Sequence, residues 1–429
     1  MDPVGEIRDP VHGYIRIDDV EKQVIDSQVF QRLRRIRQLS GAHLTYPGAQ
    51  HTRFDHSLGT MHLAGFATDS LASKVPLSDF EKREVRLAAL LHDVGHGPFS
   101  HLMEEVMVER RKITHEDITQ RVVRETEIGE VVERAGFDAK ELSDFSVGHS
   151  KKKPRYLNEV IRGGLSVDIM DYLLRDSYFT GVEYGKVDVN RVISSFEVID
   201  DGLGLDHAAL YAFEALMIAR YEMFRAVYFH RTVRAAGIML TRAMALADDE
   251  LHLTDTSDLF RYLSLTDEVV LQSLLNLEPR GKEDLRKARR LAEDYRDRRL
   301  LKCVYEKHVH RKDALMERIF SQKRIRDQLA GEIAEDAKVD PGQVYIDVPT
   351  TPSVPIIGSV TPSSIALVYG GAEGRKHQIL RIEELPLVGA IAGFFDILRV
   401  YTLAEHRHQV ERAAKRLFGG ESFIAKISM

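Results

Sequence analysis

Histidine and aspartate side chains in the first third of the sequence are spaced in a way that suits a metal site. Residues 90–97 read Leu-Leu-His-Asp-Val-Gly-His-Gly, so an apolar helical run ends in His92 and Asp93 and is followed at once by glycines. A helix end of this kind presents two metal-competent side chains, and the glycines let the backbone approach closely. Because neighbouring residues diverge on a helix, His92 and Asp93 need further ligands from elsewhere in the chain.

Three side chains are candidates for the remaining ligands. His56 lies at the start of an apolar-periodic helix, His115 follows a threonine, and Asp168 lies in a helical context after the glycine pair at 163–164. Two imidazoles with two carboxylates leave open positions on an ion that takes five or six ligands, which favours manganese, iron, magnesium, cobalt or nickel over a closed structural zinc site. A lone His-Asp pair is more often a capped or solvated pair, so the prediction depends on the linked pattern.

The bulk composition is that of an ordinary soluble globular protein and narrows the function classes. Of the 429 residues, 44% are hydrophobic and 29% are charged, and the length favours two or three domains. The single cysteine, Cys303, excludes an internal disulfide framework and a cysteine-built metal site. The formal charge of −6 argues against general binding to nucleic acid. Without a long apolar run or a signal-like start, we expect a cytoplasmic protein that does not enter a membrane.

The elements that must position these side chains are mostly helical. Turn signals and alternation predict a small hairpin over residues 7–18 and a second hairpin over residues 196–205. From about residue 20 to about residue 320 the pattern is otherwise helical almost throughout, as in residues 30–39 and 79–92. We therefore expect a helical core that carries the candidate ligands.

The composition changes after about residue 320, which predicts a separate α+β domain over residues 321–429. The expected strands are 344–348, 365–369, 377–382 and 396–401, and the expected final helix runs from Leu403 to Leu417 and ends at Gly419-Gly420. Pro349, Pro352, Pro355 and Pro362 lie in the loop region that follows the first of these strands. The predicted fold class is mostly α, with small β-hairpins and a C-terminal α+β appendage.

The linked pattern resembles the signature of the HD phosphohydrolase superfamily, in which a histidine, a His-Asp pair with glycines and a later aspartate follow in order. Further segments resemble its deoxynucleoside triphosphate triphosphohydrolase branch: Asp9–Gly13, Phe30–Arg34, Gln38-Leu39, Tyr46–Ala49, Thr52–Gly59, His92–His101, Asp171–Ser177 and Tyr228–Arg231. The resemblance covers roughly residues 5 to 240 strongly. It implies an HD-type core over residues 1–320, and we expect no counterpart of the SAM domain of the mammalian members.

The resemblance implies hydrolysis of a deoxynucleoside triphosphate to the deoxynucleoside and inorganic triphosphate, with one divalent ion (manganese, magnesium, iron, cobalt, nickel or zinc). Carried over by position, the metal ligands are His56, His92, Asp93 and Asp168, and Arg53 contacts the phosphates. The groups around the attacked phosphate are His96, His101 and His115, with the carboxylate of Glu104 beside them. Tyr172 and Asp176 meet the sugar, and Gln38 and Leu39 line the base and sugar pocket.

Elementary electrostatics agrees with these roles. A cation and an arginine must offset the charge of a triphosphate before water can approach, and histidine is the side chain best able to supply a proton to the leaving oxygen near neutral pH. A competing interpretation makes His96 only an orienting neighbour of a metal ligand. His43, His51 and His62 are more simply explained as structural residues.

The resemblance also implies a homodimer or homotetramer and raises the question of regulation. Asp26, Gln31 and Arg34 match positions that bind an activating nucleotide in the animal members of the branch. The alternative is that residues 30–34 are a packed helix with charged outer positions. Both interpretations stay open at this stage.

Two positions depart from the animal members. Ile169 follows the metal aspartate where those enzymes have a lysine, and Glu104 stands where they have an aspartate. The missing cation weakens the case for a triphosphate, although the basic loop Lys151–Lys153 could compensate if it is more than solvated surface. The alternatives are therefore an HD phosphohydrolase that acts on nucleoside monophosphates or other phosphoesters, and a nucleotide-binding regulator with little turnover.

Overall fold

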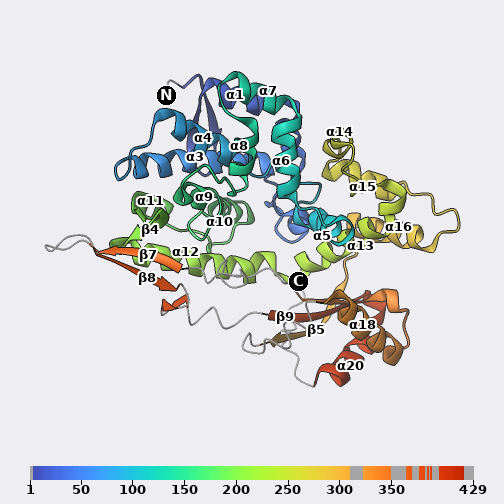
Figure 1. The fold of residues 1–429 in the computed structure, drawn as a ribbon. Helices are drawn as coiled ribbons and strands as arrows, with labels where there is room; N and C mark the ends of the chain where they lie inside the picture. The colour runs from blue at the N-terminus through green and yellow to red at the C-terminus, as the bar shows by residue number, and fades with distance from the viewer. Residues whose placement is uncertain are drawn as a thin grey trace.

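A computed structural model describes residues 3–309, 322–348, 364–369, 376–381, 384–385, 387–388 and 396–419. The chain is mostly helical, with small sheets and a C-terminal α+β region, which confirms the predicted fold class (Figure 1). Among the described helices, none combines the length and the apolar character needed to cross a bilayer. The proline-rich segment 349–363, Ile382 and Gly420 lie outside the described residues.

The helices follow one another with short connections. In the first half they are α1 (Asp19–Asp26), α2 (Gln28–Gln31), α3 (Arg53–Ala72), α4 (Asp79–Leu91), α5 (His101–Arg111), α6 (His115–Glu125), α7 (Glu127–Arg134), α8 (Ala139–Ser146), α9 (Arg155–Ile161), α10 (Val167–Thr180) and α11 (Val189–Ser194), with 3-10 helices η1 (Arg32–Arg35) and η2 (Ser40–Leu44). Further along are α12 (Leu210–Met223), the π-helical turn η4 (Phe224–Tyr228), α13 (Arg231–Leu251), α14 (Leu259–Leu263), α15 (Asp267–Leu275), α16 (Glu283–Arg296), α18 (Lys323–Ala337) and α20 (Arg407–Phe418).

Capped helix starts place several of the candidate residues. Thr52 caps α3, Thr114 caps α6 and Ser166 caps α10, and the first two caps are reciprocal capping boxes. Side chains of this type satisfy the free backbone N–H groups of a first helical turn and so fix where the helix begins. His56, His115 and Asp168 therefore all lie in the first turns of helices whose starts are fixed by local sequence.

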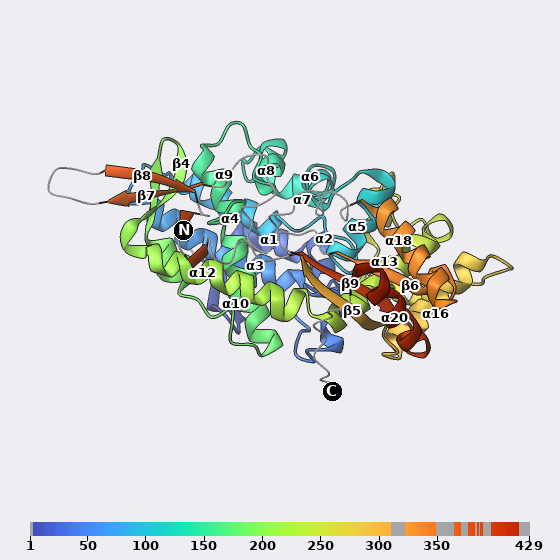
Figure 2. The same cartoon turned by 90° about the horizontal axis from the view of Figure 1, so that it is seen from below.

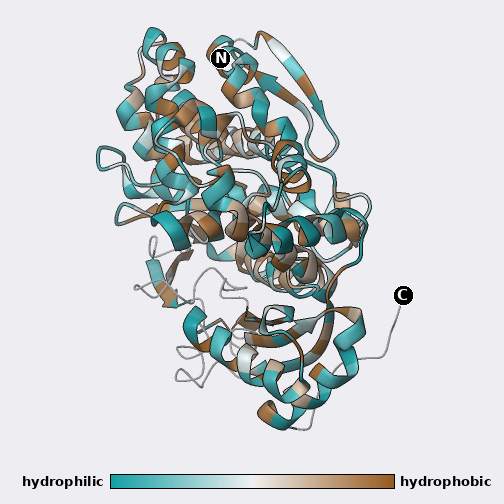
Figure 3. Cartoon of the chain, turned by 90° about the vertical axis from the view of Figure 1, so that its right-hand side faces the viewer, coloured by the Kyte–Doolittle hydropathy of each residue, from teal (hydrophilic) through white to brown (hydrophobic). Residues whose placement is uncertain are grey.

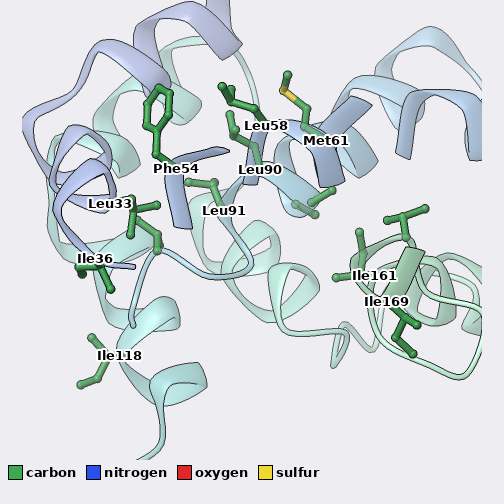
Figure 4. Close-up of a cluster of buried hydrophobic side chains, with 14 of the residues drawn as sticks. Leu33, Ile36, Phe54, Leu58, Met61, Leu90, Leu91, Ile118, Ile161 and Ile169 are labelled. Atoms are coloured by element: carbon green, nitrogen blue, oxygen red, sulfur yellow. The ribbon is translucent and has the colours of Figure 1, made fainter. Parts of the chain in front are cut away.

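One hydrophobic core runs through the helical part and joins α3, α4 and α10. Figure 4 shows part of it, with Leu58 of α3 beside Leu90 and Leu91 of α4. A Cβ atom on Gly59 would lie 1.8 Å from the Asp171 carboxylate, so glycine is needed for α3 and α10 to approach. In Figure 3, hydrophobic segments gather on the central helices, whereas hydrophilic residues cover the outer ones.

Within the described residues, three small sheets complete the fold. Strands β1 (Gly5–Asp9) and β2 (Gly13–Ile17) form an antiparallel hairpin. The second sheet has the order β3 (Phe196–Ile199), β4 (Gly202–Asp206), β7 (Ser364–Tyr369) and β8 (Lys376–Arg381), and its β4–β7 pair is parallel, with Gly204 opposite Ala366. The third has the order β5 (Lys302–Val309), β9 (Asp396–Thr402) and β6 (Val344–Asp347). It lies with α18 and α20 beneath α13 in Figure 1, and Figure 2 gives the same grouping from below.

The structure confirms both hairpins, the helix predicted over residues 79–92 and the strands predicted after residue 340, as far as these are described. The final helix begins at Arg407, four residues later than predicted. Two predictions were wrong. The helix expected over residues 30–39 breaks up after η1, because Ile36 is extended and Arg37 pairs with Thr52. The stretch 302–309, expected to be helical, is strand β5 because it pairs with the distant strand β9, with Lys302 opposite Thr402.

Candidate metal centre

The side chains predicted to hold an ion converge at the meeting point of α3, α4 and α10. His56 Nε2 lies 3.2 Å from His92 Nε2 and 3.1 Å from Asp168 Oδ1, and the last two atoms are 3.7 Å apart. Asp93 completes the group, because its carboxylate oxygens lie 3.6 Å from His56 Nε2 and 3.4 Å from His92 Nε2. One ligand atom each from His56, His92 and Asp168 thus lies within 4.8 Å of the other two, and Asp93 lies beside this group with its carboxylate paired to Arg53.

The spacing of these atoms suits a single divalent ion. Ligand atoms at about 2.1 Å from one ion lie roughly 3.0 Å apart at a right angle and roughly 3.4 Å apart at a tetrahedral angle. The measured separations of 3.1 to 3.7 Å lie within about 0.7 Å of these values, and none is shorter than the right-angle value. The two imidazoles and the Asp168 carboxylate therefore suit the kind of ion predicted from the sequence, and Asp93 as a fourth ligand stays a prediction.

Both histidines are held so that the same ring nitrogen faces this point. His56 Nδ1 bonds Asp171 Oδ2 at 2.8 Å, and His92 Nδ1 bonds the Ala89 carbonyl oxygen at 2.8 Å. An acceptor at Nδ1 takes the ring proton, so the Nε2 lone pair is left for a metal. The two imidazoles are thereby fixed in the tautomer that a metal site requires.

Asp171 anchors His56 within a buried network that sequence reasoning did not assign to the site. Its carboxylate also accepts from Arg175 and from His12 Nε2, the latter at 2.6 Å. Arg175 in turn bonds Asp9 at 2.8 Å, which ties the N-terminal hairpin to α10. Asp171 lay within a quoted motif, but no local pattern distinguished it as the partner of a candidate ligand.

The charges of the centre are strongly coupled. Burial opposes the charge of His56, but hydrogen bonds to Asp168 and Asp171 outweigh it and raise the pKa of His56 to about 10. Burial likewise opposes ionisation of Asp93, yet Arg53 and His92 hold the pKa of Asp93 well below its ordinary value. Arg53 makes a direct ion pair with the Asp93 carboxylate. Without an ion the site therefore holds both signs of charge, and an ion at His56 Nε2 would take the place of the proton there.

A second histidine cluster adjoins the centre. His115 Nδ1 bonds Glu104 Oε1 at 2.5 Å, and His101 Nδ1 bonds Glu104 Oε2 at 3.0 Å, so one carboxylate orients both rings. Burial works against this charge, but the two histidines hold the pKa of Glu104 far below its ordinary value. His96 Nε2 lies 3.3 Å from Asp93 Oδ1, which connects the cluster to the candidate metal ligands.

Three ligand atoms of this second cluster, from His96, His101 and His115, also lie close enough together to be considered for a metal. The ring arrangement disfavours that interpretation, because His96 and His115 are stacked at 3.8 Å with an interplanar angle of 14°. Lone pairs of stacked imidazoles run parallel and do not converge on one ion. The exposure of the His101 side chain, 68%, marks this cluster as the side of the site open to solvent.

The residues predicted to meet sugar and base lie on α10 and in the segment before η2. Asp176 accepts from Tyr228 Oη at 2.6 Å and bonds His51 Nε2 at 2.7 Å, so both of its oxygens already have protein partners. The Gln38 side-chain carbonyl oxygen is buried and has no hydrogen-bond partner among the described residues. A buried polar atom of this kind is available to a ligand. Leu39 packs partly buried against the core beside it.

Ile169 cannot supply a charge to the centre, because it is buried with 4% exposure and packs near Ile161 in the core (Figure 4). A cation from another element lies nearby: Arg220 of α12 bonds the Tyr172 hydroxyl. Burial lowers the pKa of Arg220 to about 10, so it keeps its charge at neutral pH, and Asp168 is among the groups that act on it. No local sequence pattern pointed to Arg220.

The remaining sequence hypotheses involve residues outside this centre. Gln31 accepts from Arg34 Nε at 2.8 Å and donates to the Ile25 carbonyl, and the Arg34 guanidinium lies 3.5 Å from the Phe54 ring centroid. Asp26 is exposed at the end of α1. In the basic loop, Lys153 pairs with Glu84 and Lys152 with Asp138, so both point to structural carboxylates. His51 is buried as expected of a structural residue.

Comparisons with known proteins agree with the geometry. Residues 53–176 match the model of the HD domain, and residues 187–366 match the model of the HD associated region. The associated region crosses residue 320, and the domain boundary there stays a prediction.

Several relatives are similar over most of the chain. An uncharacterised protein of Methanocaldococcus jannaschii is 36% identical over 280 residues, 63% of this chain and 55% of that protein. The deoxynucleoside triphosphate triphosphohydrolase SAMHD1 of Homo sapiens is 30% identical over 356 residues, 71% of this chain and 56% of that protein. The chain thus spans little more than half the length of these relatives. The crystal structure of a hypothetical protein from Aquifex aeolicus is 31% identical with a TM-score of 0.75, and the match covers 96% of this chain and all of that one.

Proposed function

The chain belongs to the HD-domain family, and from that premise we propose that it is a metal-dependent phosphohydrolase that converts a deoxynucleoside triphosphate to the deoxynucleoside and inorganic triphosphate. The observation that carries the proposal is the convergence of His56, His92, Asp93 and Asp168 beside three histidines. The similarity to enzymes named for this reaction supports the choice of substrate.

A divalent ion (manganese, magnesium, iron, cobalt, nickel or zinc) held by these four residues would supply positive charge against the phosphate oxygens. The chain adds its own cations. Arg53 lies against Asp93 and Arg220 lies against Tyr172, so both guanidinium groups border the candidate ligands. Fixed cations in a site from which water is largely excluded offset phosphate charge more effectively than cations in water.

We assign proton transfer to the cluster of His96, His101 and His115. Glu104 accepts the Nδ1 protons of His101 and His115, which leaves Nε2 of each ring free to take or give a proton. In this arrangement Glu104 is a positioning residue, and the two histidines are the candidates that touch the reacting groups. Hydrolysis to inorganic triphosphate needs a proton at the departing sugar oxygen, and a histidine at the open side of the site can deliver it.

The residues that we propose to contact the base and the sugar are Tyr172, Asp176, Gln38 and Leu39. The unpartnered Gln38 carbonyl oxygen is suited to accept a hydrogen bond from a base or sugar. Asp176, held by His51 and Tyr228, presents a fixed carboxylate toward a sugar hydroxyl.

Product analysis tests the reaction. Purified protein is incubated with manganese and each of the four deoxynucleoside triphosphates, and we expect inorganic triphosphate together with the deoxynucleoside. Monophosphate or pyrophosphate as the product would instead favour a phosphohydrolase of other specificity. If nucleotide raises the melting temperature and no divalent ion yields product, the regulator hypothesis replaces this one.

Regulation and assembly are separate parts of the proposal. We expect a cytoplasmic homodimer or homotetramer and an activating nucleotide at Asp26, Gln31 and Arg34, where Gln31 and Arg34 already contact one another. Light scattering with and without nucleotide measures the assembly. Arg34→Ala is expected to abolish nucleotide-dependent activation without lowering the basal rate.

A further inference from the structure

The loop that precedes the first proton-transfer candidate has an unfavourable backbone. Phe99 and Ser100 have φ values of 57° and 54°, and they are consecutive residues with side chains. L-residues other than glycine rarely adopt this region, and when they do the surrounding structure must hold them there. The next residue, His101, begins α5, so the loop of residues 97–100 sets where that histidine lies.

One buried carboxylate from a distant part of the chain holds this loop. Asp267, the first residue of α15, accepts the Phe99 N–H at Oδ1 (2.7 Å) and the Arg37 N–H at Oδ2 (3.1 Å). The residue is 2% exposed. Each oxygen therefore serves a different backbone donor, and the carboxylate joins the loop to the segment that follows η1.

The same loop carries a partner of the phosphate-binding arginine. Ser100 Oγ accepts from Arg53 Nε at 2.9 Å and donates to the Arg37 carbonyl at 2.8 Å. Ser40 Oγ donates to the Phe99 carbonyl at 2.6 Å, which fixes the other face of the loop. The conformation of residues 99 and 100 thus determines the position of His101 and one of the contacts of Arg53.

We infer that Asp267 is a positioning residue of the active site, whose two carboxylate oxygens hold the loop of residues 97–100 in the conformation that places His101 and Arg53. The inference rests on the proposed function for its catalytic consequence, but the loop contact itself does not. Among the described residues, Asp267 makes no hydrogen bond or ion pair with the candidate ligands, so its effect on catalysis must pass through the loop or through Arg37, which precedes Gln38.

The test compares two neighbouring carboxylates. Asp267→Asn is nearly isosteric but can accept with one oxygen only, so one of the two backbone donors loses its partner. Glu268→Gln is the matched control, because Glu268 is 62% exposed and lies 3.8 Å from the Arg37 guanidinium without touching the loop. At pH 7.5 we expect kcat of Asp267→Asn to fall about 10- to 100-fold while the bound metal is retained, since a small misplacement of a reacting group is costly.

Amide hydrogen exchange provides a readout that does not depend on activity. The peptide spanning residues 97–101 is expected to exchange faster in Asp267→Asn and at the wild-type rate in Glu268→Gln. Asp267→Glu keeps both acceptors and is expected to recover part of kcat, and it carries the test if the asparagine variant does not fold. Wild-type exchange in Asp267→Asn overturns the inference, and so does faster exchange with an unchanged kcat. If the wild-type protein hydrolyses no phosphoester, the proposed function fails by itself while the exchange experiment still decides the loop contact.

Discussion

At the scale of single residues, the site depends on the side chains behind the candidate ligands as much as on the ligands. His56 and His92 present Nε2 to a common point only because Asp171 and the Ala89 carbonyl occupy their Nδ1 positions. Asp168 differs from the other three candidate ligands because its side chain is 35% exposed, whereas theirs are at most 11% exposed. Its substitution therefore separates metal binding from folding better than a change at a fully buried ligand.

We expect Asp168→Asn to lose the bound divalent ion and the phosphohydrolase activity together and to keep the wild-type melting temperature within a few degrees, because the removed charge is partly solvated. Asp69→Asn, a 71% exposed carboxylate on α3, is the control and should retain metal and activity. Metal is measured by elemental analysis after dialysis. Full metal occupancy with normal turnover in the Asp168 variant would remove this residue from the site.

Ile169 stands where the animal members of the family have a lysine, and we expect that a lysine cannot be restored at this position without cost. Ile169→Lys would place an ammonium group in the apolar cluster near Ile161 and so lower the free energy of unfolding by roughly 2 to 5 kcal/mol without raising kcat/KM. Urea unfolding measures the change, and Ile169→Leu, which nearly conserves volume, is the control. A stable lysine variant with improved kcat/KM would mean that residue 169 can turn toward the phosphates.

Arg220 is a cation on another helix that can replace the charge missing at position 169. Arg220→Met keeps most of the apolar volume and removes the charge beside Tyr172, and we expect kcat/KM for a deoxynucleoside triphosphate to fall about 100-fold with metal retained. Arg225→Met, half exposed on the next turn, controls for the loss of a positive charge. Unchanged kinetics in Arg220→Met, or an equal effect of the control, would contradict the assignment.

What the sequence can predict at this scale follows from how local each signal is. His92 and Asp93 lie in one short motif, and His56 and Asp168 lie in linked motifs, so their convergence was predicted. Arg220 and Asp267 carry no such signal, because each is an ordinary charged residue on a helix until the fold brings it against Tyr172 or Phe99. Tertiary contact alone distinguishes them from surface charges.

At the scale of elements, helices with capped starts were predictable and elements with distant partners were not. The apolar spacing of Phe30, Leu33 and Ile36 is that of a helix, and all three are buried, yet the chain leaves helical geometry after η1. The Arg37 N–H bonds Asp267 and Arg37 pairs with Thr52, and these long-range contacts replace the helical hydrogen bonds. Strand β5 was missed for the same reason, since its partner β9 is remote in sequence.

The contact between α15 and the loop of residues 97–100 predicts that the free energy of unfolding depends on pH. Burial raises the pKa of Asp267 to about 6 against the opposing effect of the two backbone donors. The Arg37 guanidinium lies 3.7 Å from the Asp267 carboxylate. This carboxyl group also interacts electrostatically with Glu268, Arg32 and Tyr295. In the unfolded chain the carboxyl ionises near pH 4. Between these values the folded chain holds a proton that the unfolded chain lacks, so this contribution to stability is present at low pH and is lost as pH rises through about 6.

We therefore expect the free energy of unfolding of the wild type, measured relative to that of Asp267→Asn, to fall by roughly 3 kcal/mol from pH 4 to pH 7. Urea unfolding of both proteins across that range measures it, and Glu268→Gln controls for the loss of a negative charge. An ionised carboxylate that costs stability at neutral pH is consistent with a residue retained for the position of the loop. A difference independent of pH would show that the carboxyl is not buried as described.

At the scale of the whole molecule, the C-terminal sheet is packed onto the junction between η4 and α13. Arg399 of β9 donates to the Phe229 carbonyl at 2.6 Å and bonds Glu306 at 2.6 Å, and the Tyr401 hydroxyl donates to the Arg231 carbonyl at 3.1 Å. These contacts hold the residues between η4 and α13. Tyr228, the partner of Asp176, lies next to this junction, so the C-terminal part of the chain contacts the segment that holds one candidate substrate residue.

Arg399→Met tests whether that contact influences the site. The substitution leaves the Phe229 carbonyl and the Glu306 carboxylate without their buried partner, and we expect the free energy of unfolding to fall by about 3 to 5 kcal/mol. Because Tyr228 loses a fixed neighbour while the metal ligands are untouched, KM for the nucleotide should rise severalfold more than kcat falls. Arg407→Met, an exposed arginine at the start of α20, is the control for charge. If Arg399→Met lowers stability with no change in KM, the sheet stabilises the fold without shaping the pocket.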